Sequence, residues 1–186
     1  MNEKEQLSKQ FKKRKNANYY ILGFTDAEGC FNVSLKKQES TRFGWVLDPV
    51  FHITQHKNAK PVLEFVKEQL NCGRIIPKPG QEEVLQFIVD NRKQLAEKII
   101  PFFSRYRLVV KARDFESFKE IVTGLEKKEH STREGFERLL RIAFSMNMNG
   151  KQRRYKLDEI LKDLAGSSET IRQTPEQGED IVQPTQ

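Results

Sequence analysis

The chain has 186 residues, with 33 lysines and arginines against 26 acidic residues and a formal net charge of +7. Hydrophobic residues make up 37% of it, enough to bury a core, so a wholly disordered chain is excluded. No apolar run is long enough for a transmembrane helix, and Glu3 and Glu5 argue against a signal peptide or an organellar presequence. We therefore expect one basic domain without a membrane partner, flanked by tails.

Charge is distributed unevenly along the chain. Residues 165–186 contain four acids against Arg172 and few large apolar residues, which predicts an acidic, disordered tail. Two clusters are basic. The first lies in an N-terminal arm of residues 1–17 and consists of Lys9, Lys12, Lys13, Arg14 and Lys15. The second consists of Lys151, Arg153, Arg154 and Lys156. Such clusters favour nucleic acid as a partner, although charge that serves only solubility is the alternative. The folded domain is then expected over residues 18–164.

The hydrophobic pattern of the first half predicts a helix, a hairpin and a second helix. Asn18 is a candidate N-cap, Gly29 ends the first helix, Gly44 marks the hairpin turn, and Pro61 opens the second helix. Alternation of apolar and polar residues indicates the two strands. The expected elements are a helix over 19–28, strands over 31–36 and 45–55, and a helix over 58–70.

The second half predicts another hairpin and then only helices. Strands are expected on either side of Pro79-Gly80, and a capping box at Ser131–Glu134 precedes one of the helices. The expected elements are strands over 74–78 and 84–89, a helix reaching residue 103, helices starting near 111 and 133, and a last short helix over 157–164. The fold class is therefore α+β, with helices over one face of a four-stranded antiparallel sheet.

The other face of this sheet is expected to be polar and partly basic. An antiparallel sheet can leave one face in water, and such a face can lie along a DNA groove. An ordinary solvated face is the alternative. The candidate DNA-binding residues, taken from strand alternation, are Asn32, Ser34, Lys36, Gln38, His52, Thr54, Arg74, Ile76, Lys78 and Gln86.

The segment 21–29 has features that suggest chemistry. Gly23 and Ala27 are four residues apart and share one helix face, where small side chains allow another helix to approach closely. Asp26 and Glu28 lie near the helix C-terminus, where the macrodipole disfavours anions, so a compensating cation is expected. A hard ion such as Mg²⁺, bound by carboxylate and main-chain oxygens, would meet this need. The alternative is a solvated helix end followed by a turn.

Residues 21–29, ILGFTDAEG, resemble the motif of the LAGLIDADG homing endonucleases. Gly23, Asp26, Ala27 and Gly29 match this motif, and Glu28 replaces its final aspartate, where the family accepts either acid. Residues 51–57 resemble the family's second-strand segment, and residues 111–122 resemble its late basic segment. The three segments have the family's order and compatible spacing, and the resemblance spans roughly residues 18–164.

The resemblance implies a site-specific endonuclease that hydrolyses double-stranded DNA at a long pseudo-palindromic target, with its sheet shaped as a DNA-binding saddle. Because the chain has one motif, the resemblance implies a homodimer whose interface contains Leu22, Gly23, Asp26 and Ala27. The two Glu28 side chains would then lie close together, which requires bound cations. Glu28 and the main-chain carbonyl of Ala27 would bind Mg²⁺, which would activate water and stabilise the attacking and leaving oxygens.

The resemblance also assigns roles to two residues outside the motif. Gln55 matches a position that orients active-site water, although a strand-end side chain bonded to the backbone is the alternative. Lys111 matches a basic residue near the scissile phosphate, where positive charge stabilises the transition state. Arg107 and Arg113 are alternatives to Lys111, because the lysine pair often found at this place reads Val110-Lys111 here.

Two other interpretations are compatible with the sequence. One is a non-cleaving nucleic-acid-binding protein on the same scaffold, either an RNA maturase or a transcription regulator, which would have no need of an acid at residue 28. The other is a half-protein that requires a different chain. The family resemblance suggests a mitochondrion or chloroplast as the compartment, although archaeal members exist. The target site, the host gene and any role of the acidic tail do not follow from the sequence.

Overall fold

The computed structural model describes residues 17–146 and 154–170. The basic run at residues 9–15 and most of the predicted acidic tail lie outside these ranges. Inside them, the order of helices and hairpins is the predicted one. The α+β prediction is therefore confirmed, and the questions that remain concern which residues the fold brings together.

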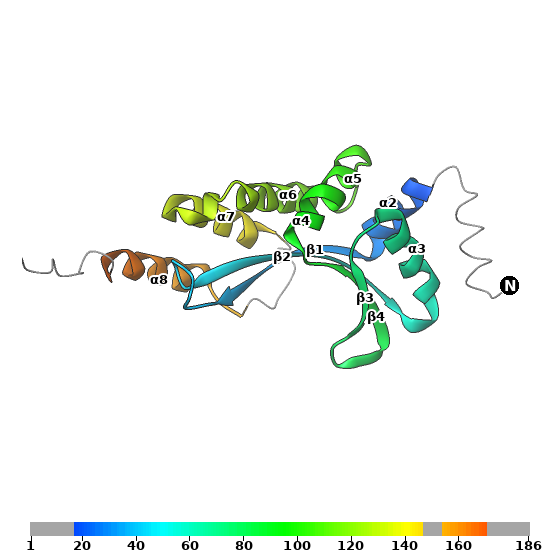
Figure 1. Cartoon of the computed structure of the whole chain (residues 1–186), viewed down its shortest axis with the longest axis horizontal. Coiled ribbons are helices and arrows are strands. Elements are labelled where there is room, and N and C mark those ends of the chain that lie inside the picture. The colour runs from blue at the N-terminus through cyan, green and yellow to red at the C-terminus, as the bar shows by residue number, and fades with distance from the viewer. Residues whose placement is uncertain (1–16, 147–153, 171–186) are drawn as a thin grey trace, which may run out of the picture.

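One curved antiparallel sheet forms the centre of the molecule. Its strands, in the spatial order β1-β2-β4-β3, are β1 (Gly29–Lys37), β2 (Trp45–His56), β3 (Arg74–Lys78) and β4 (Gln81–Val89). The long strands β1 and β2 arch across the molecule, and the β3–β4 hairpin bends away from the helices (Figure 1). The sheet therefore has a concave side that faces away from the helical layer.

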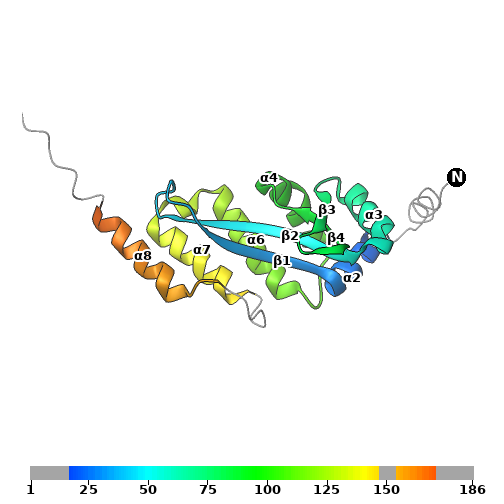
Figure 2. The same cartoon turned by 90° about the horizontal axis from the view of Figure 1, so that it is seen from below.

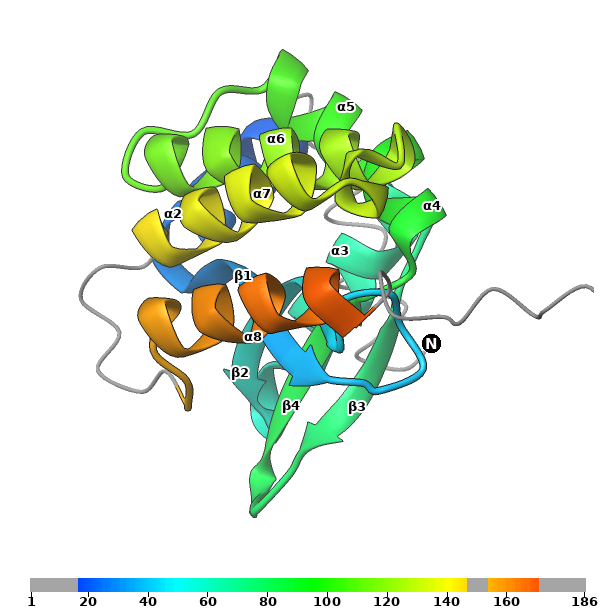
Figure 3. The same cartoon turned by 90° about the vertical axis from the view of Figure 1, so that its left-hand side faces the viewer.

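The helices lie mainly on the convex side of the sheet. They are α2 (Ala17–Glu28), α3 (Lys60–Leu70), α4 (Arg92–Gln94), a π-helical turn (Leu95–Ile99), α5 (Ile100–Arg105), α6 (Ala112–Glu126), α7 (Arg133–Ser145) and α8 (Leu157–Thr170). Seen from below, β1 and β2 pass in front of α6 and α7 (Figure 2). Helix α8 lies alongside α7 (Figure 3). Within the described ranges, none of the helices combines the length and the apolar character needed to cross a bilayer.

Phenylalanines make up the middle of the core between the sheet and the helices. The ring of Phe31 on β1 lies 4.9 Å from that of Phe51 on β2, measured between centroids. Three further rings, from Phe103, Phe115 and Phe118, lie between 5.3 and 5.5 Å from Phe31. Because these rings come from two strands and two helices, Phe31 joins the two layers of the fold.

Helix boundaries differ from the sequence prediction in three places. Asn18 does not cap α2, because the helix already includes Ala17, and the amide of Asn18 donates to the hydroxyl of Tyr106. Thr132 caps α7 by accepting from the backbone N–H of Gly135, so the capping residue is Thr132 and not Ser131. Helix α8 continues to Thr170, beyond the predicted domain end at residue 164.

Truncating the central ring should destabilise the whole domain. We expect Phe31→Ala to lower the free energy of unfolding by about 3–5 kcal/mol, because it leaves a cavity where two layers meet. Phe31→Leu, which keeps most of the volume, should cost less than about 1.5 kcal/mol. Urea denaturation followed by circular dichroism measures both values, and equal losses for the two variants would contradict the central position of Phe31.

Candidate active site at the end of helix α2

Helix α2 passes directly into strand β1 with no intervening loop. Glu28 is the last residue of the helix, its side chain is exposed, and Gly29 is the first residue of the strand. A Cβ atom on Gly29 would lie 2.6 Å from Cγ2 and 2.7 Å from the carbonyl oxygen of Thr25. Only glycine fits there, so the motif's last glycine allows the tight junction that presents the Glu28 carboxylate.

The carboxylate of Asp26 ties this junction to a distant segment of the same chain. Its Oδ2 accepts from the N–H of Val109 at 2.8 Å, and its Oδ1 accepts from the N–H groups of Val110 and Lys111, each at 3.1 Å. Hydrogen bonds to a charged acceptor are stronger than those between neutral groups. Asp26 therefore positions the 109–111 segment at the end of α2.

The ammonium group of Lys111 lies against the last carbonyl groups of α2. Its Nζ donates to the main-chain oxygen of Asp26 at 2.5 Å and lies 3.4 Å from the main-chain oxygen of Ala27. A helix C-terminus attracts a cation because it carries partial negative charge and free carbonyl groups. Lys111 thus places one positive charge at this helix end, where the sequence analysis expected a divalent metal ion.

Gln55 comes to the same end of the sheet as the motif. It is half-buried near the end of β2, two residues after Ile53, and Ile53 lies directly opposite Gly29. Glu28, Gln55 and Lys111, the three candidate catalytic residues of the sequence analysis, therefore lie at the same end of the sheet.

The two arginines considered as alternatives to Lys111 lie elsewhere. Arg107 is exposed in a groove that also contains Asn18 and Tyr19, at the start of α2. Arg113 is exposed and lines a separate groove on α6. Of these three basic residues, Lys111 is the one that the structure joins to the end of α2 by hydrogen bonds.

One side of the motif region is open and partly apolar. A Cβ on Gly23 would meet no atom within 4 Å, in contrast to Gly29, and Ala27 is exposed. Nearby lie the three most exposed large hydrophobic residues of the described chain: Tyr19 at 63%, Val109 at 82% and Val110 at 77% exposure. Leu22 is half-buried. Packing inside one chain therefore does not explain why residue 23 is small.

The predicted DNA-facing residues share the concave side of the sheet, with one exception. Nine of the ten lie in strands, and those of β1, β2 and β4 alternate with residues of the opposite face, among which Phe31, Val33, Phe51, Ile53 and Phe87 are buried in the core. Gln38 lies just after β1, where its amide nitrogen donates to Ser40. Burial and the positive charge of Lys78 lower the pKa of His52, so this imidazole is neutral at neutral pH and offers one donor and one acceptor.

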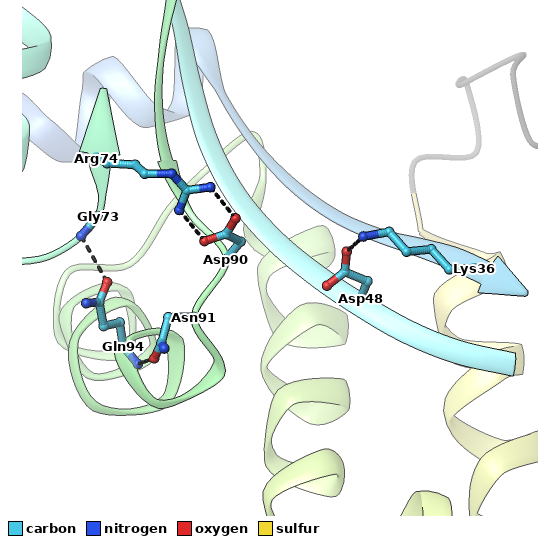
Figure 4. A network of polar contacts seen from close by, with 7 residues as sticks. All are labelled: Lys36, Asp48, Gly73, Arg74, Asp90, Asn91 and Gln94. Carbon is cyan, nitrogen blue, oxygen red and sulfur yellow. Dashed lines mark hydrogen bonds and ion pairs between the residues drawn. The ribbon is translucent and has the colours of Figure 1, made fainter. Parts of the chain in front are cut away.

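The structure adds two carboxylates to this face that the sequence analysis did not include. Asp48 on β2 lies opposite Ser34 and forms an ion pair with Lys36. Asp90, just after β4, forms two hydrogen bonds of 2.6 Å with Arg74 (Figure 4). Strand alternation could have found both, because each follows a buried residue.

The residues at the end of α2 fit a hard divalent cation. Glu28 offers an exposed carboxylate, and Ala27 offers a main-chain oxygen that already attracts the ammonium group of Lys111. Oxygen ligands of this kind suit Mg²⁺. Among the residues that the structure describes, no three His, Cys, Asp or Glu side chains gather at one point. Glu28 and Ala27 of one chain thus offer fewer oxygen ligands than a divalent cation takes.

A curved antiparallel sheet with an acid-ended motif helix at one end defines a class of DNA endonucleases, and comparison with known proteins agrees. The sequence profile of the family described as LAGLIDADG endonuclease matches residues 21–122. Homing endonuclease I-ApeII of Aeropyrum pernix is 42% identical over 147 residues, which cover 77% of this chain and 87% of that protein.

Two solved structures are similar in fold and sequence. The archaeal intron-encoded homing endonuclease I-Vdi141I, complexed with DNA, has a TM-score of 0.77 and 39% identity, with 81% of this chain and 96% of that chain covered. I-SmaMI, bound to an uncleaved DNA target in the presence of calcium ions, has a TM-score of 0.70 and 28% identity, with 78% of this chain and 48% of that chain covered. The chain belongs to the LAGLIDADG endonuclease family, which confirms the prediction from residues 21–29, and its function is that of a homing DNA endonuclease.

Replacing the carboxylate that positions the 109–111 segment should affect stability and cleavage together. We expect Asp26→Asn to lower the free energy of unfolding by about 1–3 kcal/mol, because three N–H groups lose a charged acceptor. DNA cleavage should fall as well, because Lys111 loses its fixed position. Urea denaturation and gel analysis of DNA cleavage measure the two effects. Glu126→Gln, which removes a charge from the exposed end of α6, should change neither; an unchanged Asp26→Asn protein would contradict the role of Asp26.

Proposed function

We propose that the chain acts as a homodimer that uses Mg²⁺ to cut both strands of a long, pseudo-palindromic DNA site. The observation that carries this proposal is the exposed Glu28 carboxylate beside the open Gly23 face of α2. A chain that binds DNA without cutting it, such as a maturase or a regulator, has no need of an acid at this position. Cleavage is therefore the function that the geometry supports best.

Pairing of two α2 helices explains the open side of the motif region. The space around Gly23 admits another helix backbone, and exposed Ala27, Val109 and Val110 would lose contact with water on association. The lengths of the relatives support the same arrangement. This chain covers 96% of the matched I-Vdi141I chain but 48% of the I-SmaMI chain, so it corresponds to about half of the latter. Two copies of this chain would supply two such halves.

Two chains would bring two Glu28 carboxylates together, and this pair requires positive charge between them. Glu28 and the main-chain oxygen of Ala27 would hold the metal ion. When bound, Mg²⁺ supplies Lewis-acid chemistry that makes water a better nucleophile and stabilises charge on the leaving oxygen.

The other two site residues act beside the carboxylate. Gln55 would orient a water molecule through its amide group, since it lies at the same end of the sheet as Glu28. Lys111 would place positive charge near the scissile phosphate, where a fixed ammonium group stabilises the charge that develops in the transition state. Asp26 is a positioning residue, because it acts through Lys111 and has no contact with substrate in this scheme.

The concave side of the sheet would bind the duplex. Its donors and acceptors, among them neutral His52 and the pair formed by Thr54 and Gln86, suit direct contact with base edges in the major groove. Two copies of this face, related by a dimer axis, would contact a long and nearly symmetric site. The organellar compartment stays a prediction from the resemblance, since the relative I-Vdi141I is described as archaeal and intron-encoded.

Removal of the carboxylate at the end of α2 should separate DNA binding from cleavage. We expect Glu28→Gln to keep its affinity for duplex DNA and to lose cleavage by a factor on the order of 10³, because the amide is a poor ligand for the metal. Incubation of both proteins with candidate intronless target DNA, with Mg²⁺ and with EDTA, followed by gel analysis, measures the effect. A fully active Glu28→Gln protein, or equal cleavage in EDTA, would count against the proposed mechanism.

Filling the open side of α2 should block dimer formation without harming the fold. We expect Gly23→Leu to remain folded, because a Cβ atom at this position meets no other atom within 4 Å, and to elute as a monomer with little cleavage activity. Size-exclusion chromatography with light scattering gives the mass of each protein. Thr123→Leu, which adds apolar volume at an exposed position of α6, is the matched control and should remain a dimer. A dimeric and active Gly23→Leu protein would refute the interface.

A further inference from the structure

The DNA-facing side of the sheet holds two carboxylates in a place where negative charge opposes binding. Asp48 and Asp90 lie among residues that include Lys36 and Arg74, and each acid pairs with one of these cations (Figure 4). A carboxylate on a surface that meets phosphates repels them. The acids therefore need an explanation other than affinity for DNA.

The pair between Arg74 and Asp90 is held by the backbone on both sides. The N–H of Gly73, just before Arg74, donates to Oε1 of Gln94 at 3.0 Å. The N–H of Gln94 in turn donates to Oδ1 of Asn91, just after Asp90, also at 3.0 Å. This chain of contacts fixes the ends of β3 and β4 relative to each other. The two parallel hydrogen bonds of the ion pair are therefore set up by the fold before DNA arrives.

The second pair belongs to the same group of charges. Lys36 on β1 pairs with Asp48 on β2, and the side chains are 64% and 29% exposed. The hydrogen bond from Arg74 holds the pKa of Asp90 below its usual value, and the positive charge of Lys36 acts in the same direction. The two pairs thus lie within electrostatic reach of each other. Together they make a patch of the face locally neutral.

We propose that Asp48 and Asp90 are specificity-determining residues, which pair with Lys36 and Arg74 and thereby weaken binding to DNA of the wrong sequence. The proposal rests on the proposed use of this face for DNA. Binding to unrelated DNA depends on cations that neutralise phosphates and release counterions. A cation already paired with a carboxylate contributes less to this term, so unrelated duplexes gain little from Lys36 and Arg74.

A cognate sequence can make up for the binding free energy that is lost when Lys36 and Arg74 are paired with the acids. Arg74 has N–H donors left after its two bonds to Asp90, and the Asp90 carboxylate, with about four lone-pair sites, keeps acceptor capacity after its bonds to Arg74 and to its own backbone N–H. A base edge can therefore meet a donor and an acceptor side by side. Guanine accepts from arginine, and the cytosine amino group donates to a carboxylate. The paired groups would thus select for base edges rather than for phosphates.

The test compares DNA binding by wild-type protein, Asp48→Asn and Asp90→Asn. For a duplex of scrambled sequence, we expect each variant to bind about three- to tenfold more tightly, with the salt slope steeper by about one. For the site selected by wild-type cleavage from a randomised duplex library, affinity should rise less, so the ratio between the two affinities falls. Glu126→Gln removes the same charge from α6, away from this face, and should leave that ratio unchanged.

A second comparison shows whether the acid acts through its cation. In an Arg74→Ala background, Asp90→Asn should tighten scrambled-duplex binding less than it does in wild-type protein, because removal of the carboxylate then relieves only its direct repulsion of phosphates and no longer frees a cation. Equal changes for scrambled and selected sites, with a lower unfolding midpoint, would show that the pairs are only structural and would overturn the proposal. If wild-type protein binds and cuts DNA while both asparagine variants match it, only this inference fails. If wild-type protein binds no duplex, the inference and the proposed function both fail.

Discussion

The carboxylate of Asp26 joins two segments that are more than 80 residues apart, and the candidate active site depends on this contact. Three backbone N–H groups from Val109 to Lys111 converge on its two oxygens. The same contact brings the ammonium group of Lys111 onto the carbonyl end of α2. An acid that would be unfavourable at a helix C-terminus is thus used to place a cation there.

The two sides of the sheet have different roles: the convex side packs into the core, and the concave side is the candidate DNA-binding face. Phe31, Phe51 and the helical phenylalanines fill the convex side, so stability is supplied where no ligand is expected. The concave side carries polar residues together with a few aliphatic ones such as Ile76 and Ile88. Its cations are partly neutralised by Asp48 and Asp90, which makes this surface less basic than the net charge of +7 suggests. Overall charge and the charge of the binding face are therefore different quantities in this protein.

Much of the fold could be predicted because its signals are local. Alternation over residues 31–36 and 45–55 indicated half-buried strands, and the motif at 21–29 identified Glu28 as the acid. Helix boundaries were predicted less accurately. The amide of Asn18 donates to Tyr106 instead of capping α2, and Thr132, which accepts from the N–H of Gly135, caps α7. The bonds of Asp26, and the pairing of Arg74 with Asp90, could not be predicted, because each depends on tertiary distances that no spacing in the sequence reports. The presence of an acid on the concave face, in contrast, was available from alternation and was overlooked.

The direct passage from α2 into β1 has a mechanical consequence. Glu28 ends the helix and Gly29 begins the strand, so no flexible joint separates the two elements. If β1 shifted or rotated along a duplex, the Glu28 carboxylate would move with it, because the helix and the strand are joined directly. Poor seating of the strand would then misalign the acid without any rearrangement elsewhere. Because helix and strand are covalently continuous, DNA recognition by β1 and cleavage by Glu28 would be coupled. A mismatched target would then be bound less well and also cut more slowly.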